Sequence, residues 1–160
     1  MKIVSNIDKA IIVMRDAAQW MIDNDKKVTK WWSLDNLNKE FLFQYAKPEE
    51  FYVGMVGDKP AVAAILQIEQ NAQDWKDISD KPALYVHWLC VTRDFASKGA
   101  SKQMIDFAEN LARKDGINFL RADTDADNPQ LRKVYKKLGF SLVTILEEDY
   151  RNTAFYQKEI

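Results

Sequence analysis

The run Val91-Thr-Arg-Asp-Phe-Ala-Ser-Lys-Gly-Ala-Ser101 joins the clearest predicted strand of the chain to its clearest predicted helix. The residues before it, 84–91, are rich in β-branched and aromatic side chains, which favours a strand. The residues after it, 101–114, repeat apolar side chains at helical spacing. Small side chains at the junction let a ligand approach the backbone, and the start of a helix attracts anions such as phosphate. An ordinary solvated connection explains the same residues equally well.

Periodicity outward from this run predicts an α/β domain built on one mixed central sheet with helices on both faces. Gly57-Asp58 is a strong hairpin signal, Asp8 is a candidate helix cap, and Pro129 suits the first turn of a helix. The polar segment 71–82 is predicted to be a loop. The predicted strands are 2–7, 51–56, 61–70, 84–91, 117–122, 140–146 and 154–159. The predicted helices begin near residue 8, span 34–45 and 101–114, and begin again at residue 129.

Length and composition exclude several classes of protein. The 160 residues are 47% hydrophobic and 29% charged, which is typical of one globular domain, here expected to span residues 1–160. A net charge of −1 gives no electrostatic basis for binding nucleic acid or an anionic membrane. One cysteine, Cys90, excludes an internal disulfide, and the lack of long apolar runs favours a cytoplasmic protein.

Two segments carry a resemblance to a known family. Leu89-Cys-Val-Thr-Arg-Asp-Phe-Ala-Ser-Lys-Gly-Ala-Ser-Lys-Gln-Met-Ile105 resembles the acetyl-CoA motif of the GNAT N-acetyltransferases. Asn128-Pro-Gln-Leu-Arg-Lys-Val-Tyr-Lys-Lys-Leu-Gly-Phe140 resembles a second segment of the same family. The order of the predicted elements fits this family over nearly the whole chain, so the resemblance implies the single-domain GNAT fold. The sequence departs from the family at Ala96, where Gln or Arg is usual, and at Ser101, where Gly or Ala is usual.

The resemblance implies a set of cofactor contacts. The loop would bind the pyrophosphate of acetyl-CoA, the strand end would pair with pantetheine, and an amide near Leu89 would polarise the acetyl carbonyl. Asn128 would contact the pantetheine arm, although a plain helix cap explains it too. The implied cofactor-binding residues are Leu89, Cys90, Val91, Ser97, Lys98, Gly99, Ala100, Ser101, Lys102, Asn128 and Tyr135.

Two residues are candidates for proton transfer. His87 is the only histidine, and an imidazole suits a general base near neutral pH. Some GNAT enzymes carry a histidine on this strand as a base; a purely structural histidine, Glu69 and a water relay are the alternatives. A regular strand would place Tyr85, His87, Leu89 and Val91 on one face and Cys90 on the other, which argues against a Cys–His pair.

Tyr135 lies on a predicted apolar helix face with Leu131, Val134 and Leu138, so packing alone explains it. The resemblance implies that it protonates the departing thiolate of coenzyme A. The acidic run 123–127 lacks the glycine and glutamate of a calcium loop and is predicted to be a polar turn that attracts cationic substrates. No metal site is predicted.

The expected function is transfer of acetyl from acetyl-CoA to a primary amine by direct attack, and the expected acceptor is a small molecule. The alternatives are acetylation of a protein or peptide, and an inactive acyl-CoA-binding module. The expected partners are acetyl-CoA and an amine, with no nucleic acid and no membrane, in a monomer or a homodimer.

Overall fold

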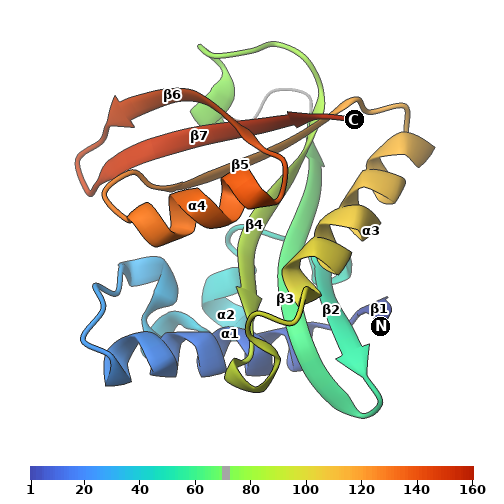
Figure 1. Cartoon of the computed structure of the whole chain (residues 1–160), viewed down its shortest axis with the longest axis vertical. Coiled ribbons are helices and arrows are strands. Elements are labelled where there is room, and N and C mark those ends of the chain that lie inside the picture. The colour runs from blue at the N-terminus through green and yellow to red at the C-terminus, as the bar shows by residue number, and fades with distance from the viewer. Residues whose placement is uncertain (70–72) are drawn as a thin grey trace. The chain divides into compact units, whose positions relative to one another are not determined.

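A computed structural model describes residues 1–69 and 73–160 of the chain (Figure 1). Seven strands form hydrogen-bonded ladders in the order β1-β2-β3-β4-β5-β7-β6, and this mixed open sheet confirms the predicted α/β class. The strands are β1 Lys2–Ser5, β2 Phe51–Val56, β3 Lys59–Glu69, β4 Ala83–Val91, β5 Phe119–Asp125, β6 Ser141–Glu147 and β7 Asn152–Glu159. The helices are α1 Ile7–Asp23, α2 Lys39–Leu42, α3 Ala100–Lys114 and α4 Pro129–Lys137.

The described chain divides into two compact units. Unit 1 comprises Met1–Leu66 and Trp88–Met104, and unit 2 comprises Gln67–His87 and Ile105–Ile160. Strands β3 and β4 and helix α3 each contribute residues to both units. The single domain over residues 1–160 stays a prediction, and the units are described separately below.

Unit 1 is an antiparallel arrangement of β1, β2 and β3 packed against α1. The predicted hairpin is confirmed, since Gly57 adopts a φ of 62° between β2 and β3, where a side chain would be strained. Helix α1 buries Ala10, Val13, Met14 and Ala18. Its cap is Asn6 rather than Asp8, because the Asn6 side chain accepts a hydrogen bond from the Lys9 N–H at 3.0 Å.

The predicted helix over residues 34–45 is wrong in extent. A 3₁₀ turn covers Leu34–Asn36, and α2 is restricted to Lys39–Leu42. Asn38 interrupts the helical pattern: its side chain accepts from the Phe41 N–H at 2.9 Å and donates to the Asp35 carbonyl at 2.7 Å. Asparagine competes in this way with backbone hydrogen bonds, so it starts a new helix where periodicity alone predicts a continuous one.

Unit 2 contains the parallel pair β4–β5 and the antiparallel pairs β5–β7 and β7–β6. The strand predicted at residues 117–122 runs later, over Phe119–Asp125, because its register with β7 continues to Asp125. The strand predicted to end at Gln70 ends at Glu69 in the described chain, and Gln70, Asn71 and the next residue lie outside the described residues. Within the predicted loop, Gln73–Trp75 forms a 3₁₀ turn.

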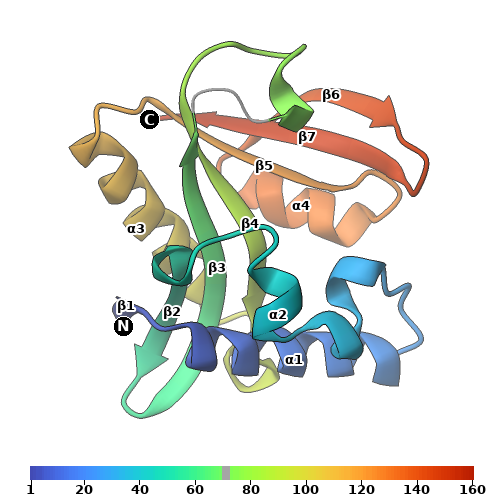
Figure 2. The same ribbon diagram turned by 180° about the vertical axis from the view of Figure 1, so that it is seen from behind.

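The two faces of the unit 2 strands are covered differently. Lys158 on β7 forms an ion pair with Glu109 on α3 and donates a 3.0 Å hydrogen bond to the Leu138 carbonyl after α4. Both helices therefore lie on one face of these strands (Figure 1). Trp75 packs edge-on against Tyr85 and Phe155 on the other face. The segment Gln73–Pro82, called here the cover segment, therefore lies over that second face (Figure 2).

Helix α4 begins as the sequence predicts, with Asn128 as its cap and Pro129 in its first turn. Its predicted apolar face is only partly correct, however. Tyr135 is buried, whereas Leu131 and Val134 are 39% and 40% exposed. Strand β6 likewise exposes Leu142, Val143, Ile145 and Leu146, and it is the edge strand next to β7 in the described sheet.

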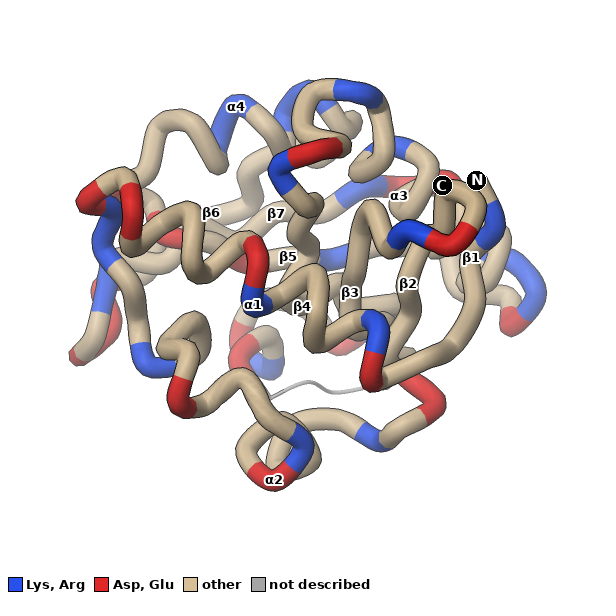
Figure 3. Tube along the Cα trace, turned by 90° about the horizontal axis from the view of Figure 1, so that it is seen from below, with Lys and Arg blue, Asp and Glu red and all other residues tan. Residues whose placement is uncertain are grey.

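Acidic and basic residues are interspersed along the trace of each unit (Figure 3), in keeping with the balanced charge. Among the described residues, no helix is long and apolar enough to cross a membrane. No group of three potential metal ligands occurs in ranges 1–69 and 73–160.

Candidate active site

The loop between β4 and α3 has the backbone shape of an anion-binding turn. Ser97 and Gly99 adopt left-handed φ values of 61° and 79° on either side of Lys98, and α3 begins at Ala100. Left-handed residues next to a helix start turn successive N–H groups toward one side of the chain. A Cβ built at Gly99 would meet no described atom within 4 Å, so the space beside this backbone is open. This geometry fits a phosphate group.

Unit 1 holds the start of this loop firmly. The Arg93 N–H donates to Asp16 Oδ2 on α1 at 2.9 Å, and the Arg93 guanidinium lies 4.1 Å above the ring centre of Trp20. The Thr92 N–H donates to the Ala61 carbonyl on β3 at 3.0 Å. Lys98 Nζ donates to the Asp94 carbonyl at 2.8 Å. The loop backbone is therefore fixed before any ligand arrives, which reduces the entropy lost on binding.

Strand β4 is continuous but distorted at Trp88, which has a φ of 50°. The predicted common face of His87, Leu89 and Val91 rests on regular alternation, and a left-handed residue between them breaks that alternation. The Trp88 indole N–H donates to the Trp31 carbonyl at 3.0 Å, and its ring lies 5.7 Å from that of Tyr45. Side-chain contacts thus hold the irregular backbone immediately before Leu89.

Cys90 is buried in the core of unit 1, and burial raises the pKa of its thiol. A thiol that resists ionisation is a poor nucleophile. The structure therefore supports the prediction that Cys90 does not act in a Cys–His pair.

His87 lies in unit 2 beside an aromatic ring and a set of charges. Its imidazole is nearly parallel to the Tyr85 ring, at 9° and 6.3 Å between centres. Charge on His87 lowers the pKa of Asp74, so the two groups are within electrostatic reach. No described contact joins Glu69, the alternative base, to His87; Glu69 is exposed at the end of β3.

Asp74 stands among other acidic groups on the same unit. Partial burial raises its pKa, and the nearby carboxylates of Asp123 and Glu148 raise it further. Charges on His87 and Arg151 oppose this increase. Arg151 also pairs with Asp123 at 3.4 Å. Within the set of groups that act on Asp74, three carboxylates thus face the cationic guanidinium of Arg151 and the imidazole of His87.

Tyr135 is buried on α4 between two aromatic rings. It stacks on Tyr156 at 18° and 5.5 Å, and it meets Phe140 edge-on at 5.6 Å. Asn128 caps the same helix, since its side chain accepts from the Leu131 N–H at 3.2 Å. The capping explanation of Asn128 is confirmed. The polar turn predicted over 123–127 is confined to the end of that run, since β5 continues to Asp125 and the Asp125 side chain accepts from the Asp127 N–H at 2.9 Å.

The predicted site residues fall into two groups. Leu89, Cys90, Val91 and the loop 97–102 lie in unit 1, and His87, Asn128 and Tyr135 lie in unit 2. Asp74 and Arg121 are not signalled by any sequence pattern. Their surroundings depend on contacts between the cover segment and distant strands, which periodicity does not report.

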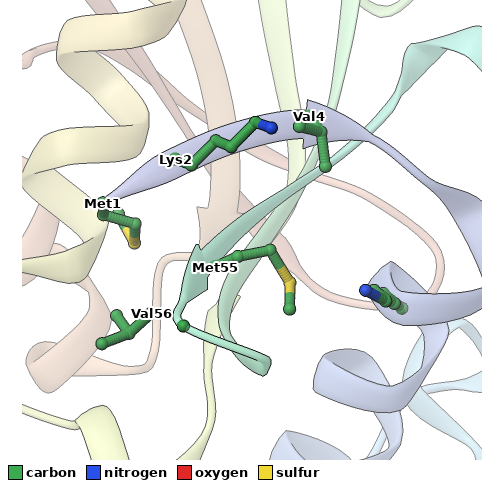
Figure 4. A pocket seen from close by; sticks show the side chains of 7 residues that line it. Met1, Lys2, Val4, Met55 and Val56 are labelled. Carbon is green, nitrogen blue, oxygen red and sulfur yellow. The ribbon is translucent and has the colours of Figure 1, made fainter.

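A hollow of about 580 Å³ occurs elsewhere in unit 1 (Figure 4), and none of the predicted site residues lines it. Its wall is made by Met1, Lys2, Val4, Lys9, Met55, Val56 and Gly57.

Comparison with known proteins gives concordant results. Residues 13–140 match the model of the acetyltransferase (GNAT) family. The uncharacterized N-acetyltransferase YesJ of Bacillus subtilis is 27% identical over 130 residues, covering 78% of this chain and 64% of YesJ. The chain thus spans less than two thirds of that relative.

Solved structures of the same family share the fold. A GNAT acetyltransferase from Listeria monocytogenes is 26% identical with a TM-score of 0.72, covering 99% of this chain and 94% of its own. One from Streptococcus agalactiae is 16% identical with a TM-score of 0.78, covering 99% and 95%. With the family model matching most of its length, this chain belongs to the GNAT acetyltransferase family.

Proposed function

We propose that the chain is an acetyl-CoA-dependent N-acetyltransferase acting on a small cationic amine. The observation that carries this proposal is the pair of left-handed residues Ser97 and Gly99 just before the start of α3, inside the segment that matches the family. Acetyl-CoA supplies the thioester. The backbone of residues 97–102 would bind its pyrophosphate, and Leu89, Cys90 and Val91 would pair with its pantetheine arm.

The side chains supply proton transfers at both ends of the reaction. His87 would accept a proton from the ammonium of the acceptor, since only a neutral amine attacks a carbonyl. A nitrogen–carbon bond then forms as the carbon–sulfur bond breaks. The Tyr135 hydroxyl would give a proton to the leaving sulfur, as a positioned phenol can. An N–H near Leu89 would stabilise the developing oxyanion.

The acidic surroundings of His87 favour a cationic small amine as acceptor. Asp74, Asp123 and Glu148 would attract an ammonium and hold it near the base. The decisive experiment is a panel of amines incubated with acetyl-CoA, followed by release of free thiol and the mass of the product. Turnover of diamines, but not of amines whose remaining groups are uncharged or acidic, would support the proposal. Modification of a peptide alone would favour a protein acetyltransferase, and binding without turnover would favour an inactive module.

Acetyl-CoA is expected to stabilise the protein against heat. A ligand present at 100 times its dissociation constant adds about 2.7 kcal/mol to the free energy of unfolding. For a chain of this length that corresponds to a rise in Tm of about 5–10 °C. Differential scanning fluorimetry with millimolar acetyl-CoA measures it, with free adenine as the control. No shift would count against a coenzyme A site.

Tyr135→Phe is expected to slow turnover by about 10²–10⁴-fold while cofactor binding persists, because the change removes only the hydroxyl that protonates the sulfur. The measurement is kcat with saturating acetyl-CoA. Tyr156→Phe is the matched control, since it removes a hydroxyl from the ring stacked on Tyr135. Unchanged turnover in Tyr135→Phe would make Tyr135 a packing residue only.

A further inference from the structure

Arg121 on β5 is a buried cation without a carboxylate partner among the described residues. It is 0% exposed. Its Nη1 donates to the Lys81 carbonyl and to the Tyr85 hydroxyl, both at 2.9 Å, and its Nε donates to Gln157 Oε1 at 3.0 Å. Its Nη2 has no described hydrogen-bond partner. A buried charge without an anion is costly, so a neutral side chain would fill this space at lower cost.

Aromatic rings surround the guanidinium and replace part of its lost hydration. Its centre lies 4.9 Å from the ring centre of Trp75 and 5.8 Å from those of Tyr85 and Phe119. Such cation–π contacts orient the guanidinium as well as stabilise it. The planar fork of Arg121 is therefore held in one orientation, with its donors aimed at Tyr85 and at the cover segment.

The contact with Tyr85 leads directly to His87. Arg121 fixes the hydroxyl end of Tyr85, and Trp75 packs edge-on against the ring at 6.2 Å. The ring so fixed is the one nearly parallel to the His87 imidazole. Displacement of Tyr85 would therefore remove the aromatic ring that lies parallel to the imidazole.

The contact with Lys81 leads to the same place by a second route. Lys81 lies near the end of the cover segment, which also carries Asp74 and Trp75. The Trp75 ring packs directly against the guanidinium. Arg121 therefore anchors the segment at two points. The position of the Asp74 carboxylate depends on this anchoring. Charge on His87 lowers the pKa of that carboxyl, so the two groups interact.

We propose that Arg121 is a positioning residue for His87, because it holds the Tyr85 ring parallel to the imidazole and holds the cover segment that carries Asp74. The proposal rests on the proposed function for its effect on turnover, and on geometry alone for its effect on His87. Arg121 touches neither substrate nor the reacting atoms in this scheme.

The test uses the full chain with three variants: Arg121→Met, Arg121→Lys and Tyr85→Phe. Misplacement of a catalytic group by about 1 Å costs on the order of 10²-fold in rate. We expect Arg121→Met to lower kcat by this factor while the thermal shift with acetyl-CoA persists. Arg121→Lys should recover part of the loss. The double variant Tyr85→Phe with Arg121→Met should lower kcat by less than the product of the two single fold-changes. Both substitutions remove the same hydrogen bond between Arg121 and the Tyr85 hydroxyl.

The second readout is independent of turnover. His87 is the only histidine, so its imidazole signals are identifiable in an NMR spectrum without assignment of the chain. The chemical shifts of its ring protons should change in Arg121→Met and in Tyr85→Phe. They should stay in place in Arg132→Met, which removes a similar arginine–tyrosine hydrogen bond, to Tyr156 at 3.1 Å.

Several results would overturn the proposal. Unchanged His87 signals and unchanged kcat in folded Arg121→Met would make Arg121 purely structural. If Arg121→Met does not fold, unchanged signals in Tyr85→Phe would have the same meaning. If the unmodified protein turns over no amine, the proposed function fails, and the NMR comparison still decides whether Arg121 positions His87.

Discussion

His87→Gln should lower kcat/KM by about 10²–10⁴-fold and leave only the fall in rate toward acidic pH that protonation of the acceptor amine itself causes. A protonated imidazole cannot accept the proton of the ammonium, so the help that His87 would give to proton removal requires its neutral form. Glutamine keeps a polar side chain of similar reach and has no basic nitrogen. The measurement is kcat/KM from pH 5 to 9 with an amine from the panel.

Deprotonation of the acceptor also favours high pH, so the comparison must be made between variants with the same amine. The thermal shift with acetyl-CoA serves as the control for an intact fold. A His87→Gln variant that keeps full turnover and the same acidic limb would leave His87 structural. The base would then be Glu69 or a water chain, or the amine would bind already neutral.

Gly99→Glu should weaken acetyl-CoA binding by at least about 10²-fold. Gly99 has a φ of 79° and open space beside it, so a side chain there would enter the proposed phosphate position. A carboxylate placed against a pyrophosphate costs several kcal/mol through repulsion between like charges. Isothermal titration calorimetry with acetyl-CoA measures the change.

Gly99→Ala is the matched control for backbone strain. Any Cβ at this φ costs about 1–2 kcal/mol, and alanine carries this cost without charge or length. We therefore expect Gly99→Ala to lower Tm while leaving acetyl-CoA affinity much closer to that of the unmodified protein. An unchanged affinity in a folded Gly99→Glu variant would place the phosphates elsewhere.

The parts of the fold that could be predicted from sequence are those fixed by neighbours in the chain. The hairpin at Gly57, the cap at Asn128 and the helix after residue 100 each depend on a turn, a side-chain cap or a local period. The errors have the same origin. Asn6 and Asn38 capture nearby N–H groups, and these local competitors outweigh the apolar spacing that predicts helix boundaries.

The candidate site was predictable only where a motif was continuous in sequence. Nothing near Trp88 predicts a left-handed residue within a strand, because the contacts that hold it come from Trp31 and Tyr45. An arginine in an apolar strand also gives no hint of burial. Arg121 is buried because Trp75 and Lys81, some forty residues earlier, close over it.

The inaccessible thiol of Cys90 has a practical consequence for every experiment above. Release of coenzyme A is measured with disulfide reagents that react with thiolates, and the only cysteine of the folded protein is buried and resists ionisation. The enzyme should therefore contribute almost no background. Unfolding would expose Cys90 to the reagent, so the reagent without substrate counts one reactive thiol for each unfolded molecule. Reaction of Cys90 thus measures the unfolded fraction of each variant in the same assay.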